Sequence, residues 1–269
     1  MKLTNIFSML GGLALFLYGM NMMSNGLELA AGNKMKTILE KLTSNRILGV
    51  LVGALVTAII QSSSATTVMV VGFVNSGLMS LTSAVWVIMG ANIGTTITGQ
   101  LIAIDITAIA PLIAFIGVAM IVFFKSKKLD AFGSVIGGLG ILFIGMETMS
   151  NAMVPLRTMP EFVGLISKFQ NPFIGILVGA LFTALIQSSS ASVGILQALA
   201  KSGVMTLSSS IYVLFGQNIG TCITSVLASI GTSKNAKRTT IIHLTFNIIG
   251  TVIFVSISML FLSLIWLKV

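Results

Sequence analysis

The chain has 269 residues, of which 55% are hydrophobic and only 8% are charged. Soluble domains carry about 25% charged residues, so this chain cannot cover a surface that faces water, and we predict an all-α membrane protein without a soluble catalytic domain, hence not an enzyme. The formal net charge of +9 comes from bases clustered in short loops between apolar runs, a pattern typical of membrane topology that argues against a nucleic-acid partner.

The first predicted crossing covers residues 5–24, behind Lys2. A base ahead of an apolar run is also typical of a cleaved secretory signal peptide. However, the glycine-rich pattern over 11–24 recurs over 137–150, deep inside the chain. We therefore expect a retained helix in a multi-pass protein of the cell membrane, which in a bacterium is the inner or plasma membrane.

An offset of 126 residues aligns the first half of the chain with the second. Residues 45–98 laid over 171–224 give 28 identities in 54 positions. We therefore predict a duplication, with one transmembrane repeat at 1–126 and the other at 127–269. The identical polar groups include Gln61–Ala65 with Gln187–Ala191, and Asn92–Thr95 with Asn218–Thr221.

The segment after the polar stretch 25–44 is too short for two full crossings. An apolar run over 47–60 stops at a Gln-Ser-Ser-Ser group, and a second run follows over 65–78. Each run has about 14 residues, whereas a crossing needs about 20. The segment is either one long helix or a re-entrant helical hairpin that turns at the serines. We favour the hairpin, because serine-rich tips can satisfy free backbone groups that line a polar cavity.

Two more crossings complete the first repeat. The segment 84–104 is long enough to cross but carries glycine and polar residues in its middle, which predicts a broken helix. These residues are Gly90, Asn92, Gly94, Thr95, Thr96, Thr98, Gly99 and Gln100. The apolar run over 106–124 crosses once more before the linker at Lys125.

The number of crossings decides how the two copies are related. A hairpin that returns to its own side leaves three crossings in each repeat and gives an inverted-topology repeat, whereas a full crossing makes four and gives parallel copies. With three crossings, ten of the 15 bases lie opposite the N-terminus, so the positive-inside rule places both termini outside. The ten are Lys34, Lys36, Lys41, Arg46, Lys125, Lys127, Lys128, Lys234, Lys237 and Arg238.

Two hairpin tips and two broken helices would meet near the bilayer midplane. They would supply hydroxyls, amides and helix N-termini for an anion, and neutral oxygens for a small cation. The candidate side chains are Gln61, Ser62, Ser63, Ser64, Asn92, Thr95, Thr96, Gln187, Ser188, Ser189, Ser190, Asn218 and Thr221. No Asp or Glu occurs between Glu40 and Asp105, and none follows Glu161. A sodium ion there would lack a carboxylate, so we expect it to bind together with the anion.

The same residue types also have a packing role in membrane proteins. Serine, threonine and glycine in membrane helices commonly serve close packing, and their hydroxyls donate to i−4 carbonyls. The double occurrence of the same motif favours a binding site instead. Proton coupling is disfavoured, because the apolar segments offer only Glu147 and His243 as proton carriers.

The Gln-Ser-Ser-Ser groups at 61–64 and 187–190, each followed by Asn-Ile-Gly-Thr, resemble those of the type II sodium-dependent phosphate cotransporters and their bacterial relatives. The resemblance spans nearly the whole chain and implies inorganic phosphate as substrate and sodium as coupling ion. It implies substrate contacts at Gln61, Ser62, Ser63, Ser64, Gln187, Ser188, Ser189 and Ser190. It implies sodium contacts at Gln61, Ser64, Asn92, Thr95, Thr96, Gln187, Ser190, Asn218 and Thr221.

The chain departs from the family pattern in two places. Cys222 stands where the first repeat has Thr96, which puts a hydroxyl contact there in doubt. Some bacterial relatives continue into a helical cytoplasmic regulatory domain, and because the sequence ends at Val269 we expect no regulation of that kind.

We therefore expect a secondary transporter of the alternating-access type that couples sodium entry to phosphate transport within the lipid bilayer and needs no cofactor. The alternatives are a carrier of another small oxyanion, a sodium-independent anion channel, and a non-transporting membrane scaffold. The sequence leaves the oligomeric state, the sodium stoichiometry and the direction of transport open.

Overall fold

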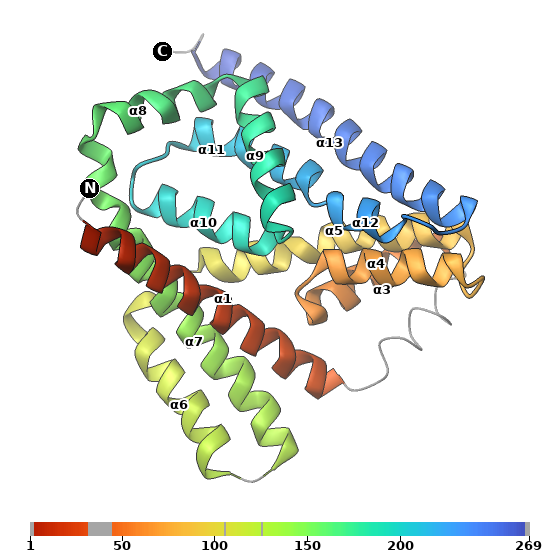
Figure 1. Ribbon diagram of the computed structural model, residues 1–269, viewed down its shortest axis with the longest axis horizontal. Helices are drawn as coiled ribbons and strands as arrows, with labels where there is room; N and C mark the ends of the chain where they lie inside the picture. Colours follow the sequence, from red (N-terminus) through yellow and green to blue (C-terminus); the bar gives the residue numbers. More distant parts are fainter. Residues whose placement is uncertain (1–2, 32–44, 105, 125, 267–269) are drawn as a thin grey trace.

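The computed structural model describes residues 3–31, 45–104, 106–124 and 126–266, and these residues form helices and connecting turns without a strand (Figure 1). The charged loop predicted around Lys34, Lys36 and Lys41 lies outside the described residues, as does Lys125. The main helices are α1 (Leu3–Ala31), α3 (Arg46–Ile60), α4 (Ser63–Asn75), α5 (Leu81–Ala103), α6 (Ala110–Phe123), α7 (Lys127–Met153), α8 (Pro160–Ser167), α9 (Pro172–Ile186), α10 (Ser189–Lys201), α11 (Leu207–Gly220), α12 (Ile223–Ala228) and α13 (Lys234–Trp266).

Five helices in the described part of the chain are long and apolar enough to cross a membrane. They are Leu3–Ala30, Leu81–Ala103, Lys127–Thr158, Leu207–Ala228 and Lys234–Leu260. A sixth candidate is the pair Pro160–Gln170 and Pro172–Ile186, which is bent by 106°. The predicted all-α, multi-pass membrane protein is therefore confirmed. The predicted crossing over 106–124 is a helical segment, Thr107–Phe123, at the lower limit of a spanning length.

Helices α1 and α7 pack against each other along a row of glycines. A Cβ on Gly12 would lie 2.6 Å from the backbone nitrogen of Met149, and one on Gly138 would lie 2.5 Å from that of Met23. Gly138 and Met149 are the counterparts of Gly12 and Met23 at the offset of 126 residues. The same contact therefore occurs twice, as it would in two helices related by a two-fold axis. Gly26, near the other end of α1, faces Ala131, so the two helices are antiparallel.

The helix that ends each half packs differently in the two halves. Helix α6 lies along α7, where Gly117 meets Gly137. Its counterpart α13 contacts α4, α5, α11 and α12 and runs alongside α11 and α12 in Figure 1. The buried residues form one cluster around α3, α4 and α5, another around α1, α7 and α10, and a third, smaller one between α8, α10 and α11.

Helix α5 is continuous, so the predicted break over 84–104 is wrong for the first half. Its glycines serve packing instead, because a Cβ on Gly90 would overlap the carbonyl of Val50, and one on Gly94 the carbonyl of Ala54. Thr95 Oγ1 donates to the carbonyl of Ala91 at 3.0 Å inside the same helix. In the second half, a turn at 221–222 does separate α11 from α12.

Candidate functional site

Each Gln-Ser-Ser-Ser group forms a sharp turn between two short helices. Gln61 has φ 57° and ψ 23° and Gln187 has φ 57° and ψ 22°, both left-handed, and extended serines follow them. Thr57 Oγ1 donates to Thr66 Oγ1 at 2.9 Å. Nine residues of a straight helix would separate these side chains by about 13 Å, so the chain turns back on itself. The alternative of one long helix over 47–78 is therefore wrong, and the hairpin is present.

The first serine of each group caps the helix that follows it. Ala65 N donates to Ser62 Oγ at 3.2 Å, and Ala191 N donates to Ser188 Oγ at 3.2 Å. Because each serine oxygen accepts a backbone N–H, its own O–H remains free to donate outward. The first backbone N–H groups of α4 and α10 lack a partner within the helix, and each helix N-terminus carries partial positive charge. Both tips therefore present hydrogen-bond donors suited to an anion.

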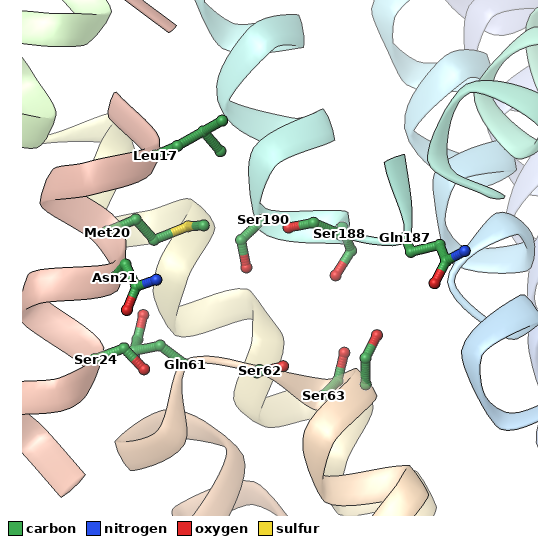
Figure 2. A pocket seen from close by; sticks show the side chains of 12 residues that line it. Leu17, Met20, Asn21, Ser24, Gln61, Ser62, Ser63, Gln187, Ser188 and Ser190 are labelled. Carbon is green, nitrogen blue, oxygen red and sulfur yellow. The ribbon is translucent and has the colours of Figure 1, made fainter. Parts of the chain in front are cut away.

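The two tips face each other across a cavity of about 340 Å³. Figure 2 shows Ser62 and Ser63 of one tip opposite Ser188 and Ser190 of the other, with α1 along one side. The lining residues are Leu17, Met20, Asn21, Ser24, Gln61, Ser62, Ser63, Ser64, Gln187, Ser188, Ser189 and Ser190. All eight predicted substrate contacts thus lie in one cavity, and none of the described residues that line it is charged.

The two glutamines of the tips differ in their contacts. Gln61 is 6% exposed, its amide nitrogen donates to the carbonyl of Ala58, and its Oε1 accepts a hydrogen bond from Thr98 Oγ1 at 2.8 Å. Its amide thereby ties the tip to α5 and offsets the left-handed backbone, which is unfavourable for a residue with a Cβ. Gln187, in contrast, is exposed. Of the two, Gln187 has the more available side chain for a ligand.

The other predicted sodium contacts lie elsewhere. Asn92, Thr95, Thr96 and Asn218 line a second cavity of about 480 Å³ between α5, α10 and α11, and Ser190 lines both cavities. Thr96 Oγ1 donates to the carbonyl of Ile93 at 2.7 Å. The structure therefore does not bring these side chains into the cavity between the tips.

Thr221, the remaining predicted sodium contact, is also occupied within the protein. It is 4% exposed, and its Oγ1 donates to the carbonyl of Gln217 at 2.9 Å. Such a bond to the i−4 carbonyl is the packing role of membrane threonines.

Helix α1 contributes four lining residues that the sequence motifs did not indicate: Leu17, Met20, Asn21 and Ser24. Their spacing of i, i+3, i+4 and i+7 is that of one helix face. The sequence signal that could have indicated them is the presence of two polar residues, Asn21 and Ser24, on one face of an apolar helix. The residues were missed because nothing in the sequence indicates which face of α1 meets the hairpins.

The potential proton carrier His243 lies inside the protein, away from the cavity between the tips. It is 1% exposed, and its Nδ1 lies 3.1 Å from Ser225 Oγ. Cys222 accepts a bond from Asn247 Nδ2 at 3.3 Å. Among the described residues no group of three or more His, Cys, Asp or Glu side chains is placed to hold a metal ion.

Comparisons with known proteins match the chain to one family of membrane transport proteins. A family model described as Na+/Pi-cotransporter matches residues 15–151 and 158–268. "Uncharacterized protein YqeW" of Bacillus subtilis (strain 168) is 34% identical over 238 residues, which are 87% of this chain and 76% of that protein. "Putative inorganic phosphate export protein YjbB" of Escherichia coli (strain K12) is 28% identical over 247 residues, which are 91% of this chain.

The chain spans less than half of YjbB, at 45% of its length. "Sodium-dependent phosphate transport protein 2A" of Rattus norvegicus is 40% identical over 105 residues, which are 38% of this chain and 16% of that protein. No solved structure matches the chain.

Proposed function

The chain belongs to the Na+/Pi-cotransporter family, and on this premise we propose that it is a secondary transporter that moves inorganic phosphate together with sodium. The observation that carries the proposal is the pair of serine-capped tips facing each other across an uncharged cavity. Serine hydroxyls and helix N-termini on both sides suit a tetrahedral oxyanion. The substrate contacts are the serines at 62–64 and 188–190 together with Gln187, and Gln61 fixes the tip.

Sodium serves as the coupling ion, because the described residues that line the cavity include no base that would neutralise a phosphate dianion. Hydroxyl and amide oxygens can coordinate sodium beside the anion, and each ion then lowers the electrostatic penalty of the other. Binding of the two ions is therefore cooperative, which is the physical basis of coupled transport. The serine oxygens at positions 64 and 190 and the amide oxygen of Gln187 remain the proposed sodium ligands at the tips.

The two repeats, 1–126 and 127–269, are inverted relative to each other in the membrane. The antiparallel pairing of their equivalent first helices, α1 and α7, supports this arrangement. Each repeat then makes three crossings, and its hairpin re-enters from one side to about mid-depth, where the two tips meet. The polar cavity between the tips can satisfy non-helical backbone at this depth.

A difference between the two hairpins supports alternating access. Helix α10 of the second hairpin packs on α7, where Ser150 Oγ donates to the carbonyl of the fully buried Ala198 at 3.3 Å. The counterpart of Ala198 in the first hairpin is Gly72, and a Cβ there would meet nothing within 4 Å. Helix α10 is thus docked on α7, whereas its counterpart α4 is not, and the first hairpin meets α1 through α3 and the Ser24–Ile60 bond. Exchanging these two arrangements would expose the cavity to the opposite side.

The proposal is tested by uptake of radiolabelled phosphate into proteoliposomes that contain the purified protein. An inward sodium gradient should drive accumulation above the external concentration, and an equal potassium gradient should not. Equal uptake in both salts would point to an anion channel and overturn the coupling. Accumulation of sulfate and not of phosphate would identify sulfate as the substrate and overturn the assignment of phosphate. No uptake of either would leave the protein without the proposed activity. Reversing the sodium gradient in loaded vesicles measures the capacity for export.

A further inference from the structure

Helix α1 forms a third wall of the cavity between the tips, and this wall is half apolar and half polar. Leu17 and Met20 form the apolar part of the wall, and Asn21 and Ser24 form the polar part. The face is continuous because these residues repeat at the spacing of one helical stripe. A ligand held between the serines of the tips therefore also meets α1 (Figure 2).

Of the two polar groups on this wall, Ser24 is already used within the protein. Its Oγ donates to the backbone carbonyl of Ile60, the last residue of α3. This bond satisfies a carbonyl at the end of a helix that has no partner within the helix itself. Ser24 is thus a positioning residue that joins α1 to the first tip, and its proton is unavailable to a ligand.

Asn21 has no such partner. Its side chain is exposed, and within the described part of the chain its amide makes no hydrogen bond. Figure 2 shows its side-chain nitrogen directed into the cavity. An amide without a partner is unfavourable in the middle of an apolar helix unless it faces water or a ligand.

The counterpart of Asn21 in the second half of the chain is a charged residue that lies outside this cavity. At the offset of 126 residues, α7 carries Glu147, which is not part of the lining of this cavity. A carboxylate at the position of Asn21 would place a negative charge beside the bound anion in a weakly screened interior. An asparagine there keeps the wall uncharged and supplies two N–H donors.

We propose that Asn21 contacts the transported oxyanion and donates hydrogen bonds to it from α1, opposite the serines of the tips. The identity of the anion as phosphate rests on the proposed function. The contact itself does not, because any tetrahedral oxyanion between the tips would meet the same amide.

The test compares two asparagines on one helix. Asn25 is exposed like Asn21 and lies one turn further along α1, but it is not part of the cavity lining. Asn21→Ala should raise the KM for phosphate about 10- to 100-fold, which is the range for loss of a hydrogen bond to a charged group. Asn21→Asp should raise it further through repulsion. Asn25→Ala and Asn25→Asp should change it less than about twofold.

Three outcomes would overturn the inference. A phosphate KM of the wild-type value in both Asn21 variants would show that the amide does not contact the anion. A lower KM for sodium in Asn21→Asp, with an unchanged KM for phosphate, would show that the side chain at position 21 contacts sodium instead of the anion. Equal effects at positions 21 and 25 would indicate a general disturbance of α1. Failure of the proposed function is distinct, since the wild-type protein would then accumulate no phosphate.

A second measurement does not depend on transport and can be used if one of these variants misfolds. In a Cys222→Thr background, single Asn21→Cys and Asn25→Cys variants are treated with a charged thiol reagent. Phosphate with sodium should slow labelling at position 21 and leave position 25 unchanged. Equal labelling rates at position 21 with and without phosphate would contradict the contact.

Discussion

Two glutamines with the same backbone conformation have different contacts in the two tips. Gln61 bonds to Ala58 and Thr98 and is buried, whereas Gln187 is exposed and lies at the edge of the cavity lining. The sequence identifies both as candidates because they precede identical serine groups. It cannot separate them, because the partner of Gln61 is 37 residues away, at Thr98.

At the residue scale we predict that Gln61→Ala destabilises the protein more than Gln187→Ala. The first substitution removes a buried hydrogen bond and leaves Thr98 without its acceptor, which costs about 1–3 kcal/mol. The second removes an exposed side chain, and we expect less than about 0.5 kcal/mol. Thermal unfolding in detergent measures both, and phosphate uptake should fall in both. Equal unfolding temperatures would contradict the structural role of Gln61.

The same polar and small residues serve packing in one element and the cavity in another. In α5, Gly90 and Gly94 allow α3 to approach the backbone, and the hydroxyls of Thr95 and Thr96 bond within the helix. In the hairpins, the serines cap helices and face the cavity. The expectation of a broken helix over 84–104 failed because glycine in a membrane helix serves close packing as well as bending.

At the element scale, two glycines of α5 provide a matched pair. Gly94→Ala would force its Cβ into the carbonyl of Ala54, whereas the nearest atom to a Cβ on Gly99 is Val193 Cγ1 at 3.9 Å. We expect the first substitution to destabilise the protein by about 1–3 kcal/mol through overpacking. Gly99→Ala should be neutral or slightly stabilising, because alanine favours the helix. Similar unfolding temperatures for the two variants would refute the close α3–α5 contact.

The two halves of the molecule are related by sequence but arranged differently around the α1–α7 pair. Phe16 of α1 occupies the space beside Gly194 of α10, where a Cβ would overlap its ring. The counterpart of Gly194 in the first hairpin is Val68, which is 40% exposed. The second hairpin therefore shares a hydrophobic cluster with α1 and α7, and the first packs with α5 instead.

At the scale of the whole molecule, we predict that two equivalent cysteine pairs report opposite conformations. In a Cys222→Thr background, Ser150→Cys with Ala198→Cys should cross-link readily, because these positions are in contact. Ser24→Cys with Gly72→Cys should cross-link only when the first hairpin docks on α1. Either cross-link should stop transport, and substrate with sodium should change the two cross-linking rates in opposite directions. Parallel changes would contradict an exchange between the two halves.

The sequence alone determined what depends on composition and local pattern. Low charge and long apolar runs required membrane helices, and the offset of 126 residues predicted a duplication. The serine groups, with a polar break between two runs too short to cross, marked the hairpin tips. These signals are local, because turn formation and helix capping are decided by neighbouring residues.

Only the tertiary structure decided what depends on contacts between distant segments. It brought both tips into one cavity, added Asn21 and Ser24 from α1, and placed Asn92 and Asn218 in another cavity. Although the two halves share 28 of 54 residues over 45–98 and 171–224, α10 packs on α7 and its counterpart α4 does not pack on α1. Packing partners far along the chain, and not the local sequence, decide which face of each helix is covered.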